Sequence, residues 1–165
     1  MKRIWMAGAL GAMLLMLAAC GAPAEGRGTD PVALGETLLQ QGQDLPAMSV
    51  VTSQDEDGEG LFPYLSDLAY DKVEGYYFAY AAGGTAEEIA VIRLKDSADG
   101  AQARASLERH LEDRLGIFRV YDPEQVPAVE DARILVEGEM VAMLICPNSE
   151  ELEQTFRQAG EQSFD

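Results

Sequence analysis

The fold is decided by two stretches, VEGYYFAYAA at residues 73–82 and EEIAVIRLK at residues 87–95. Both are rich in aromatic or β-branched residues, and the segment between them contains two consecutive glycines, a pattern typical of a β-hairpin. Alternation along a strand places Tyr77 on the face opposite Tyr76, and the second run is also apolar at both parities. Both faces of this hairpin therefore need a cover of other apolar residues.

The aromatic residues of the first strand leave two interpretations open. Tyr76, Phe78 and Tyr80 share one face of the strand. An N-terminal helix can supply the second cover that the hairpin needs, or a partner, a ligand or a second copy of the chain can supply it. Under the second interpretation these three residues are a candidate binding face.

The carboxyl-terminal half contains a long helix, a second hairpin and a final helix. The long helix starts at about Ser97, because apolar residues then recur at spacings of four, four, four and three. ARILV and EMVAMLIC flank Glu137 and Gly138, which predicts a tight hairpin, and a last helix begins near Asn148. The recurring apolar residues of the long helix are Ala103, Leu107, Leu111, Leu115 and Phe118.

The two hairpins, each with the helix that follows it, look like two copies of one ββα unit. IAVIRLKDSAD aligns with VAMLICPNSEE without a gap, so Asp96-Ser97 and Asn148-Ser149 both fall where a strand gives way to a helix. We therefore predict an α+β domain whose sheet is antiparallel or mixed, with both helices on one face. An N-terminal helical segment precedes it, capped by Asp30 with Pro31 at its first position.

The first 20 residues have the features of a lipoprotein signal. Lys2 and Arg3 precede an uncharged apolar stretch that is short for a membrane span, which needs about 20 residues. Leu17-Ala18-Ala19-Cys20 then looks like the lipobox of bacterial lipoproteins. That resemblance implies a diacylglycerol on the Cys20 thiol and cleavage before it. The alternatives are an ordinary secretory signal and an uncleaved span.

These features predict the organisation of the whole chain. Residues 1–19 are the signal peptide, and residues 20–31 are the lipidated cysteine and a flexible tether rich in Gly, Ala and Pro. Residues 32–165 form a single α+β domain. We expect the protein to lie on the extracytoplasmic face of the cell membrane, with the lipid on Cys20 as its contact with the bilayer.

Charge excludes one class of partner. The chain carries 29 acidic and 12 basic residues, a formal charge of −17, and loss of Lys2 and Arg3 with the signal makes it −19. A field of this sign repels nucleic acid, so we expect no nucleic-acid partner.

The sequence contains no recognisable catalytic or metal-binding motif. His110 is the only histidine and lies at the edge of the helical apolar stripe, with Asp113 and Arg114 sharing its surface; we expect a packed or solvated side chain. Cys146 has no intrachain partner once Cys20 is lipidated, and it reads as a small hydrophobic residue in a strand. We predict no catalytic residue, no metal site and no cofactor.

The acidic run Asp55-Glu56-Asp57-Gly58-Glu59-Gly60 contains the D-x-D-G pattern that forms part of a calcium loop. With Gly58 at the turn position, Ser53 and Tyr64 fall where an acidic residue and a bidentate glutamate are required. The run is therefore interpreted as a solvated acidic loop that binds cations weakly at most.

Three parts of the chain carry a family resemblance: AEEIAVIRLKDSADGAQARASLERHLEDR, FRVYDPEQVPAVEDARILVEGEMVAMLI and the helix that follows. On these motifs, residues 73–160 resemble a family of bacterial lipoproteins defined by the domain DUF4358. The resemblance implies an α+β fold and a place in the cell envelope, and it implies no activity.

Together these observations favour a membrane-tethered binding or interaction module, with an envelope protein or a small ligand as its partner. The alternative is an envelope enzyme, for example a hydrolase, whose residues come together only in the folded chain. A pocket with convergent polar groups and carboxylates of perturbed pKa favours the enzyme, and an exposed apolar sheet face or groove favours the module.

Overall fold

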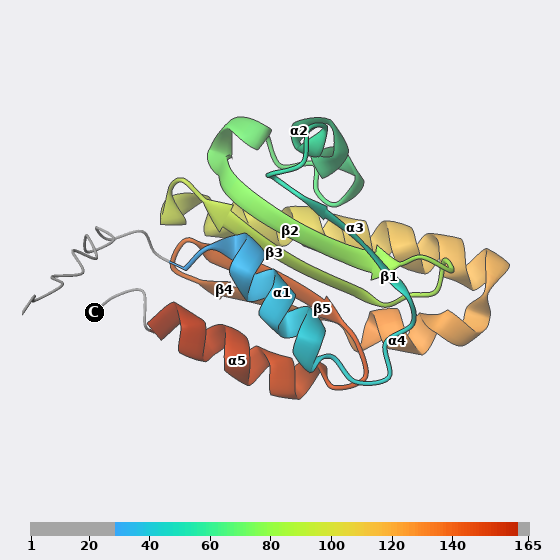
Figure 1. Ribbon diagram of the computed structural model, residues 1–165. Coiled ribbons are helices and arrows are strands. Elements are labelled where there is room, and N and C mark those ends of the chain that lie inside the picture. The colour runs from blue at the N-terminus through green and yellow to red at the C-terminus, as the bar shows by residue number, and fades with distance from the viewer. Residues whose placement is uncertain (1–28, 162–165) are drawn as a thin grey trace, which may run out of the picture.

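The computed structural model describes residues 29–161. This part of the chain contains five strands and five α-helices, together with short 3-10 turns (Figure 1). The strands are β1 (Met48–Thr52), β2 (Val73–Ala81), β3 (Glu88–Leu94), β4 (Arg133–Glu137) and β5 (Met140–Ile145). The helices are α1 (Pro31–Gln41), α2 (Gly58–Leu61), α3 (Gly100–Tyr121), α4 (Val126–Glu130) and α5 (Ser149–Glu161). The 3-10 turns are η1 (Phe62–Tyr64), η2 (Tyr70–Lys72), η3 (Ser97–Asp99) and η4 (Pro123–Gln125).

The strands form one antiparallel sheet in the order β1-β2-β3-β5-β4. The hairpins β2/β3 and β4/β5 lie where the glycine-containing turns predicted them, and they join through β3 and β5, with Val91 opposite Ala142. The α+β class is confirmed, and the sheet is antiparallel rather than mixed.

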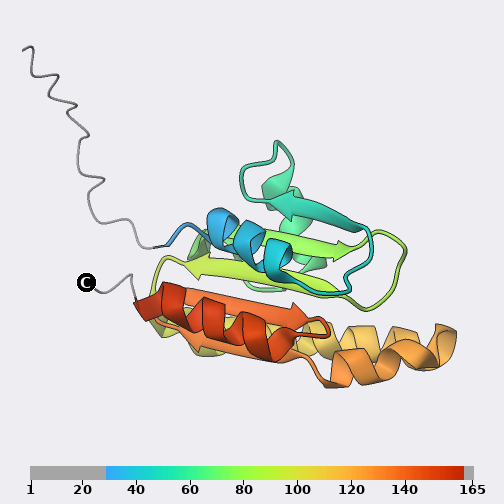
Figure 2. The ribbon, with the colours of Figure 1, turned by 60° about the horizontal axis from the view of Figure 1, so that its bottom comes forward.

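Each face of the sheet has its own hydrophobic core. The α1/α5 face consists of the sheet residues Tyr77, Ala79, Ile89, Val91, Ala142 and Leu144, which pack under α1 and α5. The α3 face consists of the sheet residues Tyr76, Phe78, Ala90, Ile92, Val141, Met143 and Ile145, which pack under α3 and the segment 58–72. Figure 2 shows α1 and α5 side by side on one side of the sheet and α3 behind it.

The placement of the last helix corrects one expectation. We expected the helices after β3 and β5 on one face, but α3 and α5 cover opposite faces. The ungapped alignment of the two halves matches Ile89 with Val141, and these residues point to the α1/α5 face and the α3 face respectively. Because matched positions have opposite parity, the helices that follow the two strands pack on opposite sides.

The N-terminal segments supply the missing cover, as the burial argument required. The Asp30 carboxylate accepts a hydrogen bond of 3.0 Å from the backbone N–H of Val32 and caps α1. Leu34 and Leu38 of α1 are buried against the α1/α5 face. The Thr29 hydroxyl donates a hydrogen bond of 3.0 Å to the carbonyl oxygen of Ala159, which fastens the start of the described chain beside the end of α5.

The segment 58–72 covers part of the α3 face through Phe62, Leu65 and Leu68, all of which are buried. It forms a short helix and two 3-10 turns, with Pro63 inside the first 3-10 turn. The hydroxyl of Ser66 lies 2.7 Å from that of Ser106 on α3, so the segment is fastened to that helix.

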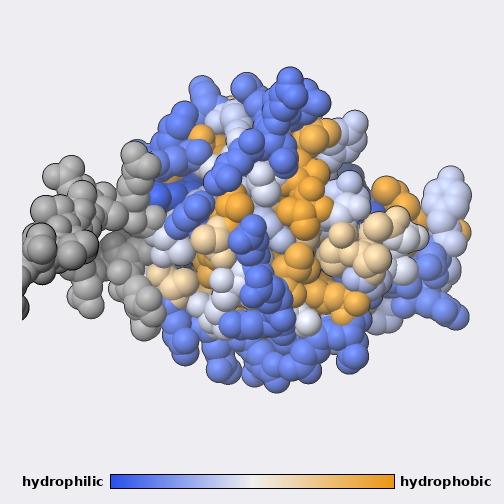
Figure 3. Space-filling view, in the orientation of Figure 1, coloured by the Kyte–Doolittle hydropathy of each residue, from blue (hydrophilic) through white to orange (hydrophobic). Residues whose placement is uncertain are grey.

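β1 is an edge strand, and its outer side is apolar. Val50 is 44% exposed, and Figure 3 shows apolar surface gathered on the side of the molecule where β1 lies. Within residues 29–161, no helix is long and apolar enough to cross a bilayer.

Candidate functional site

The three aromatic residues of the candidate binding face have different environments. Tyr76 is 1% exposed, and its hydroxyl donates a hydrogen bond of 2.6 Å to the carbonyl oxygen of Gly58. Burial raises the pKa of Tyr76 to about 12, so the phenol keeps the proton that it donates. Phe78 is also buried, whereas Tyr80 is 37% exposed. Tyr76 is therefore a core residue, and Phe78 and Tyr80 lie closer to solvent.

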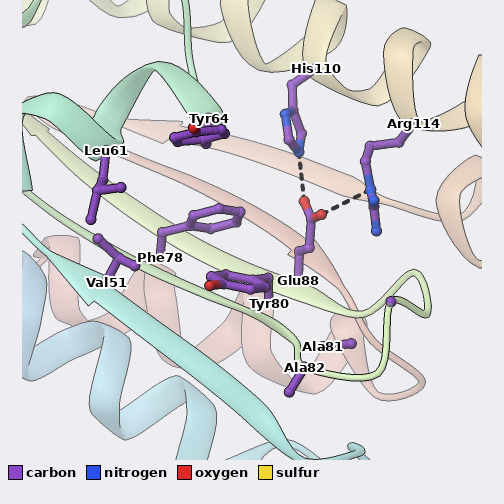
Figure 4. Close-up of a pocket in the computed structure, with 11 residues that line it drawn as sticks. Val51, Leu61, Tyr64, Phe78, Tyr80, Ala81, Ala82, Glu88, His110 and Arg114 are labelled. Atoms are coloured by element: carbon purple, nitrogen blue, oxygen red, sulfur yellow. Dashed lines mark hydrogen bonds and ion pairs between the residues drawn. The ribbon is translucent and has the colours of Figure 1, made fainter.

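Phe78 and Tyr80 help to line a pocket of about 550 Å³ on the α3 face. Its walls come from β1, the segment that contains α2 and η1, the β2–β3 turn and α3, as Figure 4 shows. The two aromatic rings lie 5.4 Å apart between centroids. The lining residues are Val51, Leu61, Tyr64, Phe78, Tyr80, Ala81, Ala82, Gly84, Glu88, His110 and Arg114.

One buried carboxylate organises the polar side of this pocket. The side chain of Glu88 is only 4% exposed, and its two oxygens have different partners. Oε2 lies 2.6 Å from Nε2 of His110, and Oε1 lies 2.9 Å from Nε of Arg114. Both partners lie one turn apart on α3, so one helix face holds them over the carboxylate (Figure 4). Burial of the Glu88 charge is compensated by this pairing.

Arg114 has further contacts that fix its side chain. Nη2 donates a hydrogen bond of 2.9 Å to the carbonyl oxygen of Thr85 in the β2–β3 turn. The guanidinium carbon lies 4.5 Å from the centroid of the Phe118 ring, a cation–π distance. Arg114 thus ties the end of the hairpin to α3 beside the pocket.

Within residues 29–161, the Glu88 cluster lacks the hydroxyl or thiol partner of a nucleophilic triad. Both carboxylate oxygens of Glu88 are engaged by its own neighbours, and no serine, threonine or cysteine of residues 29–161 has a hydrogen bond to His110. A triad would need a hydroxyl or thiol at that nitrogen. Among the same residues, no group of three or more His, Cys, Asp or Glu side chains is placed to hold a metal ion.

The position of Glu88 within its strand is a sequence signal for this site. Glu88 shares its strand parity with Ala90 and Ile92 of the α3 face, so a carboxylate was predictable on an otherwise apolar face. Its partners lie 22 and 26 positions further along the chain, and sequence alone does not bring them together. His110 lies at the margin of the helical stripe, as expected, with 13% of its side chain exposed.

The two cysteines fall in different parts of the chain. Cys20, the expected lipidation site, lies outside the described residues. Cys146 directly follows β5 and is partly buried against the core of the α1/α5 face. Burial raises the pKa of its thiol to about 11, which keeps it protonated and weakly nucleophilic near neutral pH.

Comparison with known proteins gives one match. No curated protein and no solved structure matches the chain. A family model described as a domain of unknown function, DUF4358, matches residues 49–146. The match begins in β1 and ends just after β5, so it contains every residue that lines the pocket and all of the sheet except Met48. Because it spans more than half of the sequence, the chain belongs to the DUF4358 family.

Proposed function

We propose that the protein is a lipid-anchored, extracytoplasmic binding module whose ligand site is the pocket on the α3 face. The observation that carries the binding role is the pocket itself, in which aromatic and aliphatic walls surround a fixed polar cluster. Ligand sites in proteins combine these two features, because apolar walls supply affinity and a few placed polar groups supply orientation.

The apolar side of the pocket is accessible to a ligand. Tyr64 is 73% exposed and Tyr80 is 37% exposed, so two aromatic rings of the lining reach solvent. Phe78 lies deeper, and its ring is 6.2 Å from that of His110. An apolar or aromatic group that displaces water from these rings gains free energy by burial.

The polar side of the pocket is held in place before a ligand arrives. Glu88 is paired with His110 and Arg114, and Arg114 is also tied to Thr85. Since these side chains are already ordered, binding costs little of their conformational entropy. This arrangement supports the binding role.

The binding role is tested with indole and phenol as probes in amide NMR titrations. We expect shifts concentrated at Tyr80, Ala82 and Arg114. Tyr80→Ala should weaken the response, whereas Tyr121→Ala, the same substitution at a residue 83% exposed and outside the pocket, should leave it unchanged. Shifts that are scattered over the surface, or equal in the two variants, would contradict the proposal.

The anchoring role rests on residues 1–20 and is tested separately. Cys20→Ala should abolish metabolic labelling with a fatty acid and should leave an uncleaved precursor or release the protein from membranes. Cys146→Ala is the matched control, because it removes the other cysteine and should leave labelling intact. A Cys20→Ala protein that still matures and partitions with membranes would contradict the anchor.

A further inference from the structure

We propose that the ligand of the pocket is an extended peptide segment of another protein, which pairs antiparallel with the free edge of β1 and places one large apolar side chain in the pocket. The inference rests on the proposed binding role of the pocket and names its ligand class. Three observations support it: the open edge of β1, the position of the pocket beside that edge and the charge at one end of the strand.

The hydrogen bonds of β1 show which of its residues face outward. Ser53 donates to Tyr76 and Ala47 accepts from Ala82, so the odd-numbered residues of this stretch bond to β2. Alternation then directs the amide groups of Met48, Val50 and Thr52 away from the sheet.

Of these three residues, only Thr52 has its outward N–H and carbonyl groups hydrogen-bonded within the described chain. The Asp55 carboxylate accepts a hydrogen bond of 2.6 Å from the N–H of Thr52, and the N–H of Asp55 donates to the Thr52 carbonyl. No hydrogen bond from elsewhere in residues 29–161 reaches the outward amide groups of Met48 or Val50. β1 also lacks the charged residues and prolines that protect edge strands, since its sequence is MSVVT. Edges of this kind accept an additional strand.

The pocket lies next to this edge. Val51 of β1 is one of its walls, and Val51 is paired with Phe78 on the α3 face. In an antiparallel pair, a peptide residue opposite Val51 has its side chain on the same face. That side chain is directed past Val51 toward Phe78 and Tyr80, so an aromatic residue at this position fits the apolar lining.

Charge selects the direction and the composition of the peptide. The carboxyl end of β1 leads into an exposed acidic loop that contains Asp55, Glu56, Asp57 and Glu59. The amino-terminal side of an antiparallel peptide lies beside this loop, so basic residues there are favoured. The same charge disfavours a second copy of this chain, whose formal charge is −17.

The test uses the chain from residue 21, which retains all described core residues, and a fluorescein-labelled peptide, Arg-Lys-Thr-Phe-Thr-Val-Thr. With Phe opposite Val51, the following Thr lies opposite Val50 and donates its N–H to the edge. Methylation of that nitrogen should weaken binding about tenfold, the equivalent of one net hydrogen bond. Methylation of the Phe nitrogen, which faces away, is the matched control and should have little effect.

Two further changes test the pocket and the charge. Replacement of the peptide Phe by Ala, and Tyr80→Ala in the protein, should each weaken binding by roughly tenfold. Exchange of the peptide Arg and Lys for Glu should abolish measurable binding at low salt. Added salt should weaken binding of the basic peptide, because exposed charges are screened. Fluorescence anisotropy measures each affinity.

The outcomes separate this inference from the proposed binding role. Equal weakening by the two N-methyl groups, or no peptide binding while indole still shifts the pocket amides, overturns the strand pairing and leaves the pocket as a ligand site. Loss of indole binding as well overturns both. A concentration-dependent dimer in sedimentation that excludes the peptide assigns the edge to a second copy and overturns the proposed occupant.

Discussion

The two faces of the sheet are covered to different degrees. On the α1/α5 face, Tyr77, Ile89, Val91 and Leu144 are each at most 1% exposed beneath two helices. On the α3 face, one helix and the segment 58–72 share the cover, and a pocket remains between them. The candidate site thus lies where two covering elements meet incompletely, while the fully covered face contributes stability.

The largest effect is expected from removal of the N-terminal cover. A chain that starts at Val73 lacks α1, β1 and the segment 58–72, which contribute Leu34, Leu38, Phe62, Leu65 and Leu68 to the two cores. Each such side chain contributes roughly 1.5–3 kcal/mol when buried, against a total stability of about 5–15 kcal/mol. The short chain should be unfolded or aggregated in melts and sedimentation, whereas a chain from Thr29 stays monomeric. An equally stable short monomer would refute the role of this cover.

A large difference is also expected between single substitutions on the two faces. Leu38 is fully buried on the α1/α5 face, so Leu38→Ala should lower the free energy of unfolding by about 2–5 kcal/mol. Tyr64→Ala at the pocket should change it by no more than about 0.5 kcal/mol, because that side chain is 73% exposed. Urea denaturation measures both values, and similar losses would contradict the contrast between the faces.

Two glycines provide a sharper version of the comparison. A Cβ at Gly35 of α1 would overlap the ring of Tyr77, so Gly35→Ala should destabilise the protein by about 1–3 kcal/mol. A Cβ at Gly60 of α2 meets no atom within 4 Å, so Gly60→Ala should be neutral or stabilising by up to about 1 kcal/mol. Thermal melts distinguish the two variants. A tolerated alanine at Gly35 would show that α1 packs less closely than the structure indicates.

The smallest effect concerns the ion pair that helps to fasten segment 58–72 to α3. Hydrogen bonds from Arg109 lower the pKa of Asp67 to about 2, from 3.8, with a smaller contribution from Ser106. Because the folded pKa is depressed, the stabilisation is complete above pH 3.8 and is lost as the pH falls through about 2. Both side chains are exposed, so solvent screening keeps the gain small.

The Asp67 contribution is measured with a double-mutant cycle of Asp67→Asn and Arg109→Gln. The coupling between the two residues should be present at pH 6 and should shrink between pH 4 and pH 2. Coupling that persists below pH 2 would show that the carboxylate charge is not its source.

Much of the fold followed from local patterns in the sequence. Alternation and the glycines between strands located both hairpins, and the apolar parity of VEGYYFAYAA required a second cover that α1 provides. The side on which α5 packs could not be predicted, because strands that are apolar at both parities do not indicate which face a following helix takes. Only the folded chain shows that Ile89 and Val141 point to opposite faces of the sheet.

The candidate site was less predictable because its parts are distant in sequence. The aromatic residues of β2 were identified, but only the structure shows that Tyr76 is in the core while Phe78 and Tyr80 line the pocket. The sequence does not pair Glu88 with His110, since a salt bridge between a strand and a helix has no fixed spacing. Helices and strands with regular apolar periodicity can thus be predicted from the sequence, whereas contacts that depend on tertiary packing cannot.

The hydrogen bond between Thr29 and Ala159 has a consequence for how the domain is oriented. It brings the two ends of the described chain together at one end of the sheet, whereas the β2–β3 turn beside the pocket lies at the other end (Figure 1). A domain held by its amino-terminal end therefore presents the pocket distally. Neighbouring termini also permit circular permutation, so a permuted chain that begins in the β2–β3 turn would reverse this polarity and direct the pocket back toward its attachment point.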